Sequence, residues 1–188
     1  MGGTLPTMES NGRFGQGDYF VVEADEYDNM FLGLRPEVAV ITSIEHDHPD
    51  LFRTEAEYLN AFRQFVTLLP DGGRLIVSAE DAGVQKLLKE LNLSNVEITT
   101  FALVGEGGTA VSPKKNTIAA DITATDCRPN PLGGMDFIVE DQGELVGLAR
   151  LRVPGEHNVR NALAAIIIAL DLGSILPSSA RRWPILAV

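Results

Sequence analysis

Short, continuously apolar segments that alternate with amphipathic helix patterns most constrain the fold of this chain. Residues 38–42 read VAVIT, and further apolar runs occur at residues 19–23 and 75–77. An apolar run without polar alternation is typical of a strand that is covered on both faces, as in a parallel sheet. Strands of this kind separated by helices predict right-handed βαβ units, and therefore an α/β fold with a doubly wound, mostly parallel sheet flanked by helices.

The helix patterns between these strands have clear starts and apolar faces. Thr54, with Glu57 three residues later, forms a capping-box pattern, and the helix that follows should end at the PDGG turn of residues 70–73. A second amphipathic helix is predicted over residues 81–91. The inward-facing residues expected for the two helices are Tyr58, Phe62, Phe65, Val66 and Leu69, and then Val84, Leu87, Leu88 and Leu91.

Beyond the second helix the chain becomes richer in short β segments. Four of them are separated by Gly or Pro turns, which predicts a small antiparallel β section appended to the α/β part. They occupy residues 96–101, 117–125, 135–139 and 145–151.

A loop ending at Gly155 and a helix ending at Gly173 follow this β section. We therefore expect one domain over residues 18–173. Residues 1–17 contain five glycines and predict a loop or the remnant of a truncated element, and residues 174–188 predict an irregular tail.

Composition disfavours several classes of protein. The formal net charge of −11 disfavours general binding to nucleic acid, because a polyanion would be repelled. The single cysteine, Cys127, cannot form an internal disulfide. No apolar run approaches the roughly 18 residues that a membrane-spanning helix needs. We expect a cytoplasmic protein that binds neither nucleic acid nor membrane.

The first predicted strand ends in four carboxylates within six residues, in the sequence DYFVVEADEYD of residues 18–28. Glu23 is the last residue of that strand, and His48 follows the strand at residues 38–42 in the sequence EHDH. Because ligands bind at the carboxyl ends of parallel strands, Glu23 and His48 should converge if the two strands are neighbours. A carboxylate and an imidazole suit Mg²⁺ or Mn²⁺ in a nucleotide site, with phosphate oxygens and water completing the shell. The alternative is a pair of solvated loops.

A third group of polar residues opens the last predicted helix. His157, Asn158 and Asn161 occupy its first turn, and the two asparagines share a face because they are three residues apart. An amide can pair with a purine edge or a phosphate, and an imidazole can stack on a base, so these residues are candidates for binding a nucleotide. The alternative is that Asn158 only caps the helix.

The stretches EADEYD, TSIEHDHPD and VPGEHNVRNALAA, in this order, resemble the central ATP-binding domain of the Mur ligases, and the resemblance covers residues 2–173. It implies coupling of ATP cleavage to amide-bond formation in peptidoglycan precursor synthesis. In that chemistry, a substrate carboxylate attacks the γ-phosphate to give an acyl phosphate, and an incoming amino group then displaces phosphate.

The resemblance also implies roles for five residues. Glu23 and His48 would be catalytic ligands of magnesium ions that bridge the ATP phosphates, which agrees with the dependence of phosphoryl transfer on positioning and charge neutralisation. His157, Asn158 and Asn161 would hold the adenine nucleotide. The other carboxylates of the acidic stretch are expected to shape its loop.

Within the family, the stretch FLGLRPEVAVITSIEHDHPD favours the ligases that join L-alanine to UDP-N-acetylmuramate. The alternatives are the ligases that attach a recycled tripeptide to the same sugar nucleotide, and a non-catalytic binding or scaffold module with the same fold. A Rossmann-type dehydrogenase is disfavoured because the sequence contains no G-x-G-x-x-G.

Two features depart from the family pattern. The sequence contains no G-K-T string, so the backbone amides and the lysine that would cradle the phosphates are missing, and Ser43 stands where the family usually has Asn. We therefore expect a truncated middle domain with little or no ligase activity by itself, and an exposed sheet edge that favours self-association.

Overall fold

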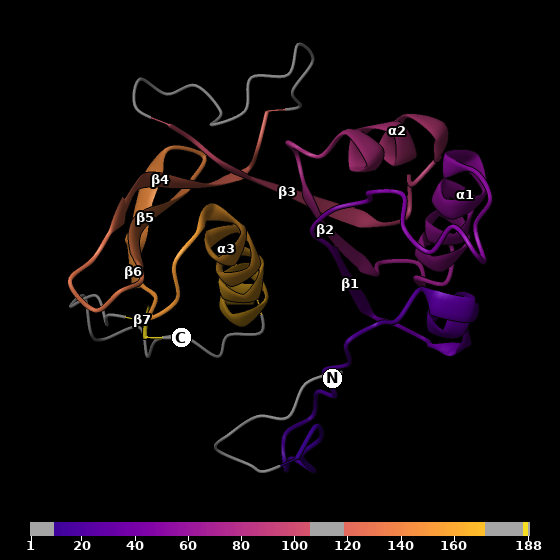
Figure 1. The fold of residues 1–188 in the computed structure, drawn as a ribbon, viewed down its shortest axis with the longest axis horizontal. Helices are drawn as coiled ribbons and strands as arrows, with labels where there is room; N and C mark the ends of the chain where they lie inside the picture. The colour runs from indigo at the N-terminus through magenta and orange to yellow at the C-terminus, as the bar shows by residue number, and fades with distance from the viewer. Residues whose placement is uncertain (1–9, 106–118, 172–185, 188) are drawn as a thin grey trace.

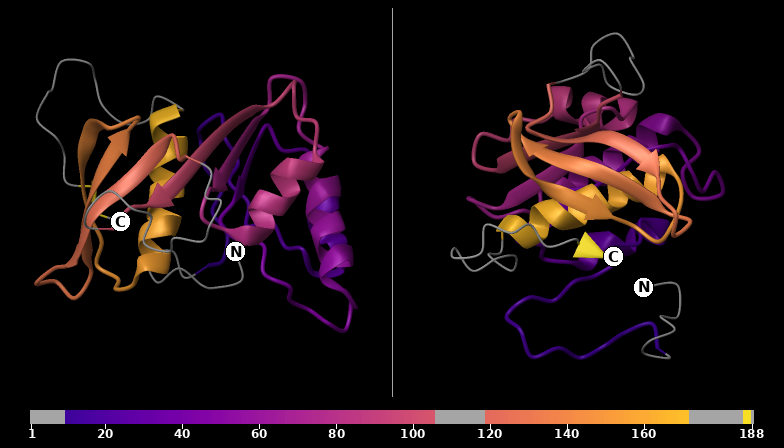
Figure 2. Two further views of the ribbon diagram at one scale, coloured as in Figure 1. Left: turned by 90° about the horizontal axis from the view of Figure 1, so that it is seen from above. Right: turned by 90° about the vertical axis from the view of Figure 1, so that its left-hand side faces the viewer.

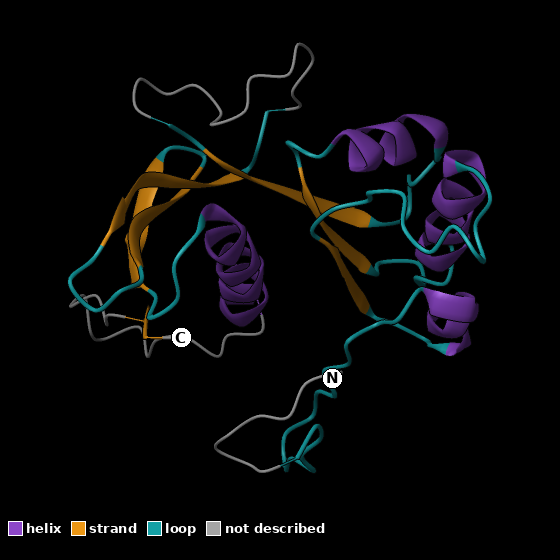
Figure 3. Ribbon diagram, viewed as in Figure 1, coloured by secondary structure: helices purple, strands orange, loops and turns teal. Residues whose placement is uncertain are grey.

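A computed structural model describes residues 10–105, 119–171 and 186–187 of the chain (Figure 1). These residues contain one seven-stranded sheet, with strand order β1-β2-β3-β4-β5-β6-β7, and helices packed against it (Figure 3). In chain order the elements are η1 (Tyr27–Gly33), β1 (Val38–Ile41), α1 (Glu55–Val66), β2 (Arg74–Ser78), α2 (Ala82–Glu90), β3 (Glu97–Leu103), β4 (Ile122–Pro129), β5 (Met135–Asp141), β6 (Glu144–Arg150), α3 (Glu156–Asp171) and β7 (Leu186–Ala187).

Strand directions confirm the predicted α/β fold. Strands β1 to β4 are parallel to one another, β4, β5 and β6 are antiparallel, and β6 pairs with β7 in parallel. The placement of residues 96–101 in the antiparallel section is wrong, because β3 pairs in parallel with both β2 and β4. A local β pattern does not encode direction; here the crossover through α2 between β2 and β3 sets it.

Alternate residues of the parallel strands face two separate hydrophobic cores. In β2, Leu75 and Val77 pack in the core shared with η1, α1 and α2, whereas Ile76 packs in the core shared with α3. Both faces of the strand are therefore covered, which explains its unbroken apolar run. The antiparallel strands β4 to β6 curve around α3, so that this helix lies between them and β1 to β3 (Figures 1 and 2).

Side-chain caps fix the starts of α1 and α2, the two helices on the same face of the sheet. The Thr54 hydroxyl accepts a hydrogen bond from the Glu57 amide at 3.2 Å, which confirms the predicted helix start. The Glu57 carboxylate, in turn, accepts from the Arg53 amide at 2.8 Å. At the start of α2, the Asp81 carboxylate accepts from the Val84 amide at 2.8 Å.

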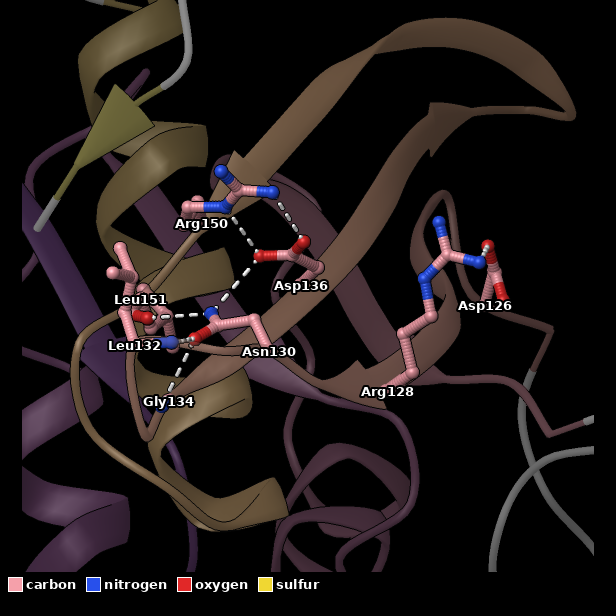
Figure 4. A network of polar contacts seen from close by, with 8 residues as sticks. All are labelled: Asp126, Arg128, Asn130, Leu132, Gly134, Asp136, Arg150 and Leu151. Atoms are coloured by element: carbon pink, nitrogen blue, oxygen red, sulfur yellow. Dashed lines mark hydrogen bonds and ion pairs between the residues drawn. The ribbon is translucent and has the colours of Figure 1, made fainter.

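A buried asparagine organises the turn between β4 and β5 (Figure 4). The Asn130 side chain donates to the Asp136 carboxylate at 3.0 Å and to the Leu151 carbonyl at 2.9 Å. Its amide oxygen accepts from the Leu132 and Gly134 amides at 2.9 and 3.1 Å. Three of these bonds hold the turn and the start of β5 together, and the bond to Leu151 connects them to the segment that leads into α3.

The Asp136 carboxylate in this network is also paired with Arg150 of the neighbouring strand. The guanidinium donates two hydrogen bonds to the carboxylate, at 2.8 and 2.7 Å. These bonds, assisted by the bond from Asn130, lower the pKa of Asp136 to about 2.

The first predicted strand, at residues 19–23, is wrong. The structure shows no strand there, and the side chains of Phe20 and Val21 are 86% and 87% exposed. A strand needs a hydrogen-bonded neighbour and a cover for its apolar face, and in the described residues β1 pairs only with β2. Apolar composition alone was therefore an insufficient signal.

None of the helices in the described part of the chain combines the length and apolarity needed to cross a bilayer. The predicted helix end at Gly173 and most of the predicted tail at 174–188 lie outside the described residues. Residues 1–9 of the loop or remnant predicted at 1–17 also lie outside them.

Candidate functional site

A cavity of about 410 Å³ lies at the carboxyl end of β1, the edge at which parallel sheets bind ligands. Three elements supply its walls: the end of β1 with the loop that follows it, the acidic segment of residues 23–28, and one face of α1. The lining residues are Ala24, Glu26, Val40, Ile41, Thr42, Ser43, Glu45, Asp47, Tyr58 and Phe62.

Glu26 is the acidic residue that connects these walls. Its carboxylate accepts a hydrogen bond from the Tyr58 hydroxyl of α1 at 3.1 Å, and one of its oxygens lies 3.5 Å from the Nε2 of His48. Burial, and then the charge of Glu26, raise the pKa of the Tyr58 hydroxyl, so Tyr58 stays a hydrogen-bond donor. We had expected Glu26 only to shape its loop, so the structure adds a residue to the site that sequence reasoning missed.

Local hydrogen bonds turn the acidic segment toward the cavity. The Asp25 carboxylate accepts from the Tyr27 amide at 2.9 Å, and the Asp25 carbonyl accepts from the Phe31 amide at 2.8 Å. Asp28 and Asn29 have φ of 50° and 56°, in the left-handed region that these two residue types tolerate best. Asp25 therefore shapes the loop, as expected.

The buried ring of Phe31 packs this loop against α1. Phe31 stacks on Phe65 of α1 with centroids 4.7 Å apart, and meets Phe62 edge-on at 5.4 Å. These apolar contacts fix where the acidic segment leaves the protein core.

His48 sits in a strained turn beside the acidic segment. Its φ of 54° is left-handed, and its carbonyl accepts hydrogen bonds from the Leu51 and Phe52 amides, both at 2.9 Å. The imidazole, with 32% of the side chain exposed, packs edge-on against the Tyr27 ring at a centroid distance of 5.1 Å. The EADEYD and EHDHPD stretches therefore lie side by side, as the sequence predicts.

Glu23 occupies a different position from the one expected. It is exposed and lies in the segment that is not a strand, just before Ala24 of the cavity wall. The carboxylates that the structure places next to the His48 imidazole include that of Glu26, 3.5 Å from Nε2, and that of Asp47, at 4.0 Å.

The first turn of α3 carries the remaining predicted residues. Gly155 has a φ of 98°, and a Cβ there would lie 2.7 Å from the Cε1 of His157, so the imidazole folds back over the glycine. The Asn158 side chain donates to the Pro154 carbonyl at 2.7 Å. His157 and Asn161 are exposed.

The donors around His48 suit a hard cation that retains other ligands. A carboxylate and an imidazole are acceptable for Mg²⁺ or Mn²⁺. Within the described residues, no three His, Cys, Asp or Glu side chains gather closely enough to enclose an ion by themselves. A metal held here would therefore take most of its ligands from phosphate and water, which is the usual arrangement for Mg²⁺ at nucleotides.

Comparison with known proteins gives a consistent result. Residues 4–169 match the family described as the Mur ligase middle domain. The UDP-N-acetylmuramate–L-alanine ligase of Bordetella pertussis is 39% identical over 178 residues, covering 92% of this chain and 34% of the relative. The chain spans about a third of the length of the curated relatives it matches.

Solved structures agree with this match. A UDP-N-acetylmuramate:L-alanyl-γ-D-glutamyl-meso-diaminopimelate ligase from Neisseria meningitides aligns with a TM-score of 0.64 and 26% identity, covering 85% of this chain and 45% of that structure. A UDP-N-acetylmuramate-alanine ligase from Thermotoga maritima aligns with a TM-score of 0.58 and 24% identity, covering 80% and 29%. The match over residues 4–169 and the observed α/β architecture together establish that this chain belongs to the Mur ligase middle domain family.

Proposed function

We propose that this chain forms the nucleotide- and metal-binding part of an ATP-dependent ligase that joins L-alanine to UDP-N-acetylmuramate, a cytoplasmic reaction of peptidoglycan precursor synthesis. The observation that carries the proposal is the acidic cavity at the carboxyl end of β1, whose lining residue Glu26 has a carboxylate oxygen 3.5 Å from the Nε2 of His48. The similarity to L-alanine ligases over 92% of the chain supports this substrate pair.

The proposed chemistry has two steps. A carboxylate oxygen of UDP-N-acetylmuramate attacks the γ-phosphorus of ATP and ADP leaves; the amino group of L-alanine then attacks the acyl carbon and phosphate leaves. Bound Mg²⁺ or Mn²⁺ would neutralise the phosphate charge. The protein residues bind and orient the reactants, which is the main requirement of phosphoryl transfer.

Each candidate residue has a proposed role. Glu23 and His48 are metal ligands, and Glu26, with a carboxylate oxygen 3.5 Å from the Nε2 of His48, orients the imidazole. The exposed His157 and Asn161, together with Asn158, contact the adenine nucleotide. Asn158 would exchange its hydrogen bond to Pro154, at 2.7 Å, for one to the nucleotide.

Calorimetric titration of the 188-residue chain with ATP, with Mg²⁺ and with a chelator, tests this proposal. We expect binding that requires the metal. His48→Ala and Glu23→Gln should each weaken binding with Mg²⁺ by roughly tenfold, and Glu144→Gln, on an exposed position of β6, should leave it unchanged. Binding that is absent, or equal with and without Mg²⁺, would favour a non-catalytic scaffold of the same fold.

A second candidate function is ligation of a recycled tripeptide to the same sugar nucleotide. The similarity to the Neisseria tripeptide ligase, with a TM-score of 0.64, favours keeping it. Competition between L-alanine and the tripeptide in a ligase that contains this chain separates the two. For the chain alone, which has no G-K-T string, we expect little or no ligase activity in a coupled phosphate-release assay.

A further inference from the structure

A buried carboxylate links the sheet to the helix that carries the proposed nucleotide-binding residues. Glu80 follows β2, and only 7% of the residue is exposed. One of its oxygens accepts a hydrogen bond from the Leu103 amide at 2.9 Å. The Arg160 guanidinium donates to both oxygens, at 3.3 and 3.4 Å. A carboxylate buried to this extent needs such partners to remain charged.

Arg160 lies on the same helical turn as the proposed nucleotide contacts. It is three residues beyond His157 and directly precedes Asn161. Its side chain is 25% exposed and also lies 3.6 Å from the Glu156 carboxylate, one turn earlier in α3. Because a helical turn is rigid, a tie from the Arg160 side chain to Glu80 restricts the position of the whole turn.

The opposite end of α3 has its own tie to the sheet. Asp171, the last residue of α3, pairs with Arg74, the first residue of β2. The helix is therefore held at its first turn to the end of β2 and at its last turn to the start of β2.

The residue next to Glu80 holds the other half of the site. One oxygen of Asp81 accepts hydrogen bonds from the Ile44 amide at 3.1 Å and from the Val84 amide at 2.8 Å. A Cβ on Gly83 would lie 2.3 Å from the Ile44 carbonyl oxygen, so the loop that leads to His48 passes directly over the start of α2. Two adjacent carboxylates thus hold the His48 loop and the first turn of α3.

We propose that Glu80 and Arg160 are a positioning pair that sets the first turn of α3 relative to the His48 loop for nucleotide binding. This inference rests on the proposed function. The pair differs from the ion pair of Asp136 and Arg150, whose bonds are 2.7 and 2.8 Å and which lies within the antiparallel strands.

Four single variants, and the double variant that combines Arg160→Met with Glu80→Gln, test the inference. Arg160→Met removes the charge and the hydrogen bonds. Arg160→Lys keeps the charge but lacks the planar guanidinium that donates to both oxygens of Glu80. Glu80→Gln keeps an acceptor for the Leu103 amide but removes the negative charge that pairs with Arg160. Arg128→Met is the matched control, because Arg128 pairs with the exposed Asp126 at 3.4 Å (Figure 4).

Two measurements are made on each variant. The first is the Kd for ATP in the presence of Mg²⁺. The second is the imidazole signal of His157 in a nuclear magnetic resonance spectrum without nucleotide, which is readily assigned because the chain has three histidines.

We expect Arg160→Met and Glu80→Gln each to raise Kd roughly tenfold, and the double variant to raise it no further because both changes break the same contact. Arg160→Lys should recover part of the loss, and Arg128→Met should behave as wild type. The His157 signal should move in Arg160→Met and stay in place in Arg128→Met, while the signal of His46 is unchanged in both.

The outcomes separate this inference from the proposed function. If wild type binds ATP and Arg160→Met binds equally well with an unmoved His157 signal, the positioning role is wrong and the proposed function stands. If wild type binds no ATP, the proposed function fails, and the role in nucleotide binding fails with it. A His157 signal that moves equally in Arg160→Met and Arg128→Met would also overturn the specific role of Arg160.

Discussion

Replacing Asn130 with alanine should destabilise the fold through the loss of hydrogen bonds alone. The side chain is buried, with 8% of the residue exposed, and it makes four hydrogen bonds (Figure 4). Two of them connect the β4–β5 turn to Asp136 and to the Leu151 carbonyl. No large apolar group is removed, so hydrophobic transfer contributes little to the change.

The size of the effect follows from the surroundings of each partner. A hydrogen bond contributes about 0.5–1.5 kcal/mol net, and more if the remaining partner stays buried and unpaired. The Leu132 amide belongs to an exposed residue and can return to water, whereas Gly134 and Leu151 are buried. Counting the three buried bonds gives a loss of roughly 2–4 kcal/mol, which corresponds to a fall in Tm of about 5–15 °C for a chain of this size.

Urea unfolding followed by circular dichroism measures this loss. Asn92→Ala is the control, because Asn92 is exposed in the loop after α2, and its free energy of unfolding should stay within about 0.5 kcal/mol of wild type. An Asn130→Ala variant that also stays within this range would refute the reasoning, because the network would then contribute nothing to stability.

Asn130→Asp supplies a second check, because aspartate has nearly the same shape as asparagine. The aspartate keeps the acceptor oxygen but loses both donors, and it places a second carboxylate beside Asp136. Like charge raises the pKa of the new carboxyl in the folded state, so the folded protein gains a proton more readily than the unfolded chain. The destabilisation should therefore be largest at neutral pH and shrink as the pH falls through that raised pKa.

Three further predictions concern other parts of the molecule. The hydrogen bonds from Arg150 lower the pKa of Asp136 from 3.8 to about 2. The stability that this pair contributes is therefore present above pH 3.8 and is lost as the pH falls toward 2. Between these two pH values, the midpoint of urea unfolding should change less for Asp136→Asn than for wild type. Burial, and then the charge of Glu156, raise the pKa of the Cys127 thiol to about 11. At pH 8 the thiol should therefore react with a disulfide reagent far more slowly in the folded chain than in urea. The rate for the folded chain should increase as the pH rises toward 11. Leu163→Ala, at a fully buried position of α3, should cost about 2–5 kcal/mol in urea unfolding, and a smaller loss would show that the sheet closes around the gap.

Local sequence signals predicted the elements whose stability is local. The Thr54 cap and the unbroken apolar run of β2 each depend on neighbouring residues, and the structure confirms both. The run at residues 19–23 is also largely apolar, yet it forms no strand, because a strand also requires a paired neighbour that no local pattern reports.

The candidate site shows the same division. Sequence order predicted that the EADEYD and EHDHPD stretches would meet, because both were assigned to the carboxyl ends of strands. The contact with the His48 imidazole is instead made three residues further along, by Glu26. The left-handed turn at Asp28 and Asn29, which follows Glu26, did have a signal in the sequence, because Asp and Asn are the residues other than glycine that most readily adopt such a turn.

The assembly of the site depends on residues with no motif of their own. The His48 loop and the first turn of α3 belong to segments more than a hundred residues apart, and they pack in the two different hydrophobic cores, on opposite faces of the sheet. The adjacent Glu80 and Asp81 lie where the two faces meet, at the end of β2, and their hydrogen bonds reach one half each. A polar tie at the strand end is therefore the means by which this fold keeps the two halves in a fixed relation, and this is why we expect Arg160→Met to change nucleotide affinity more than it changes stability.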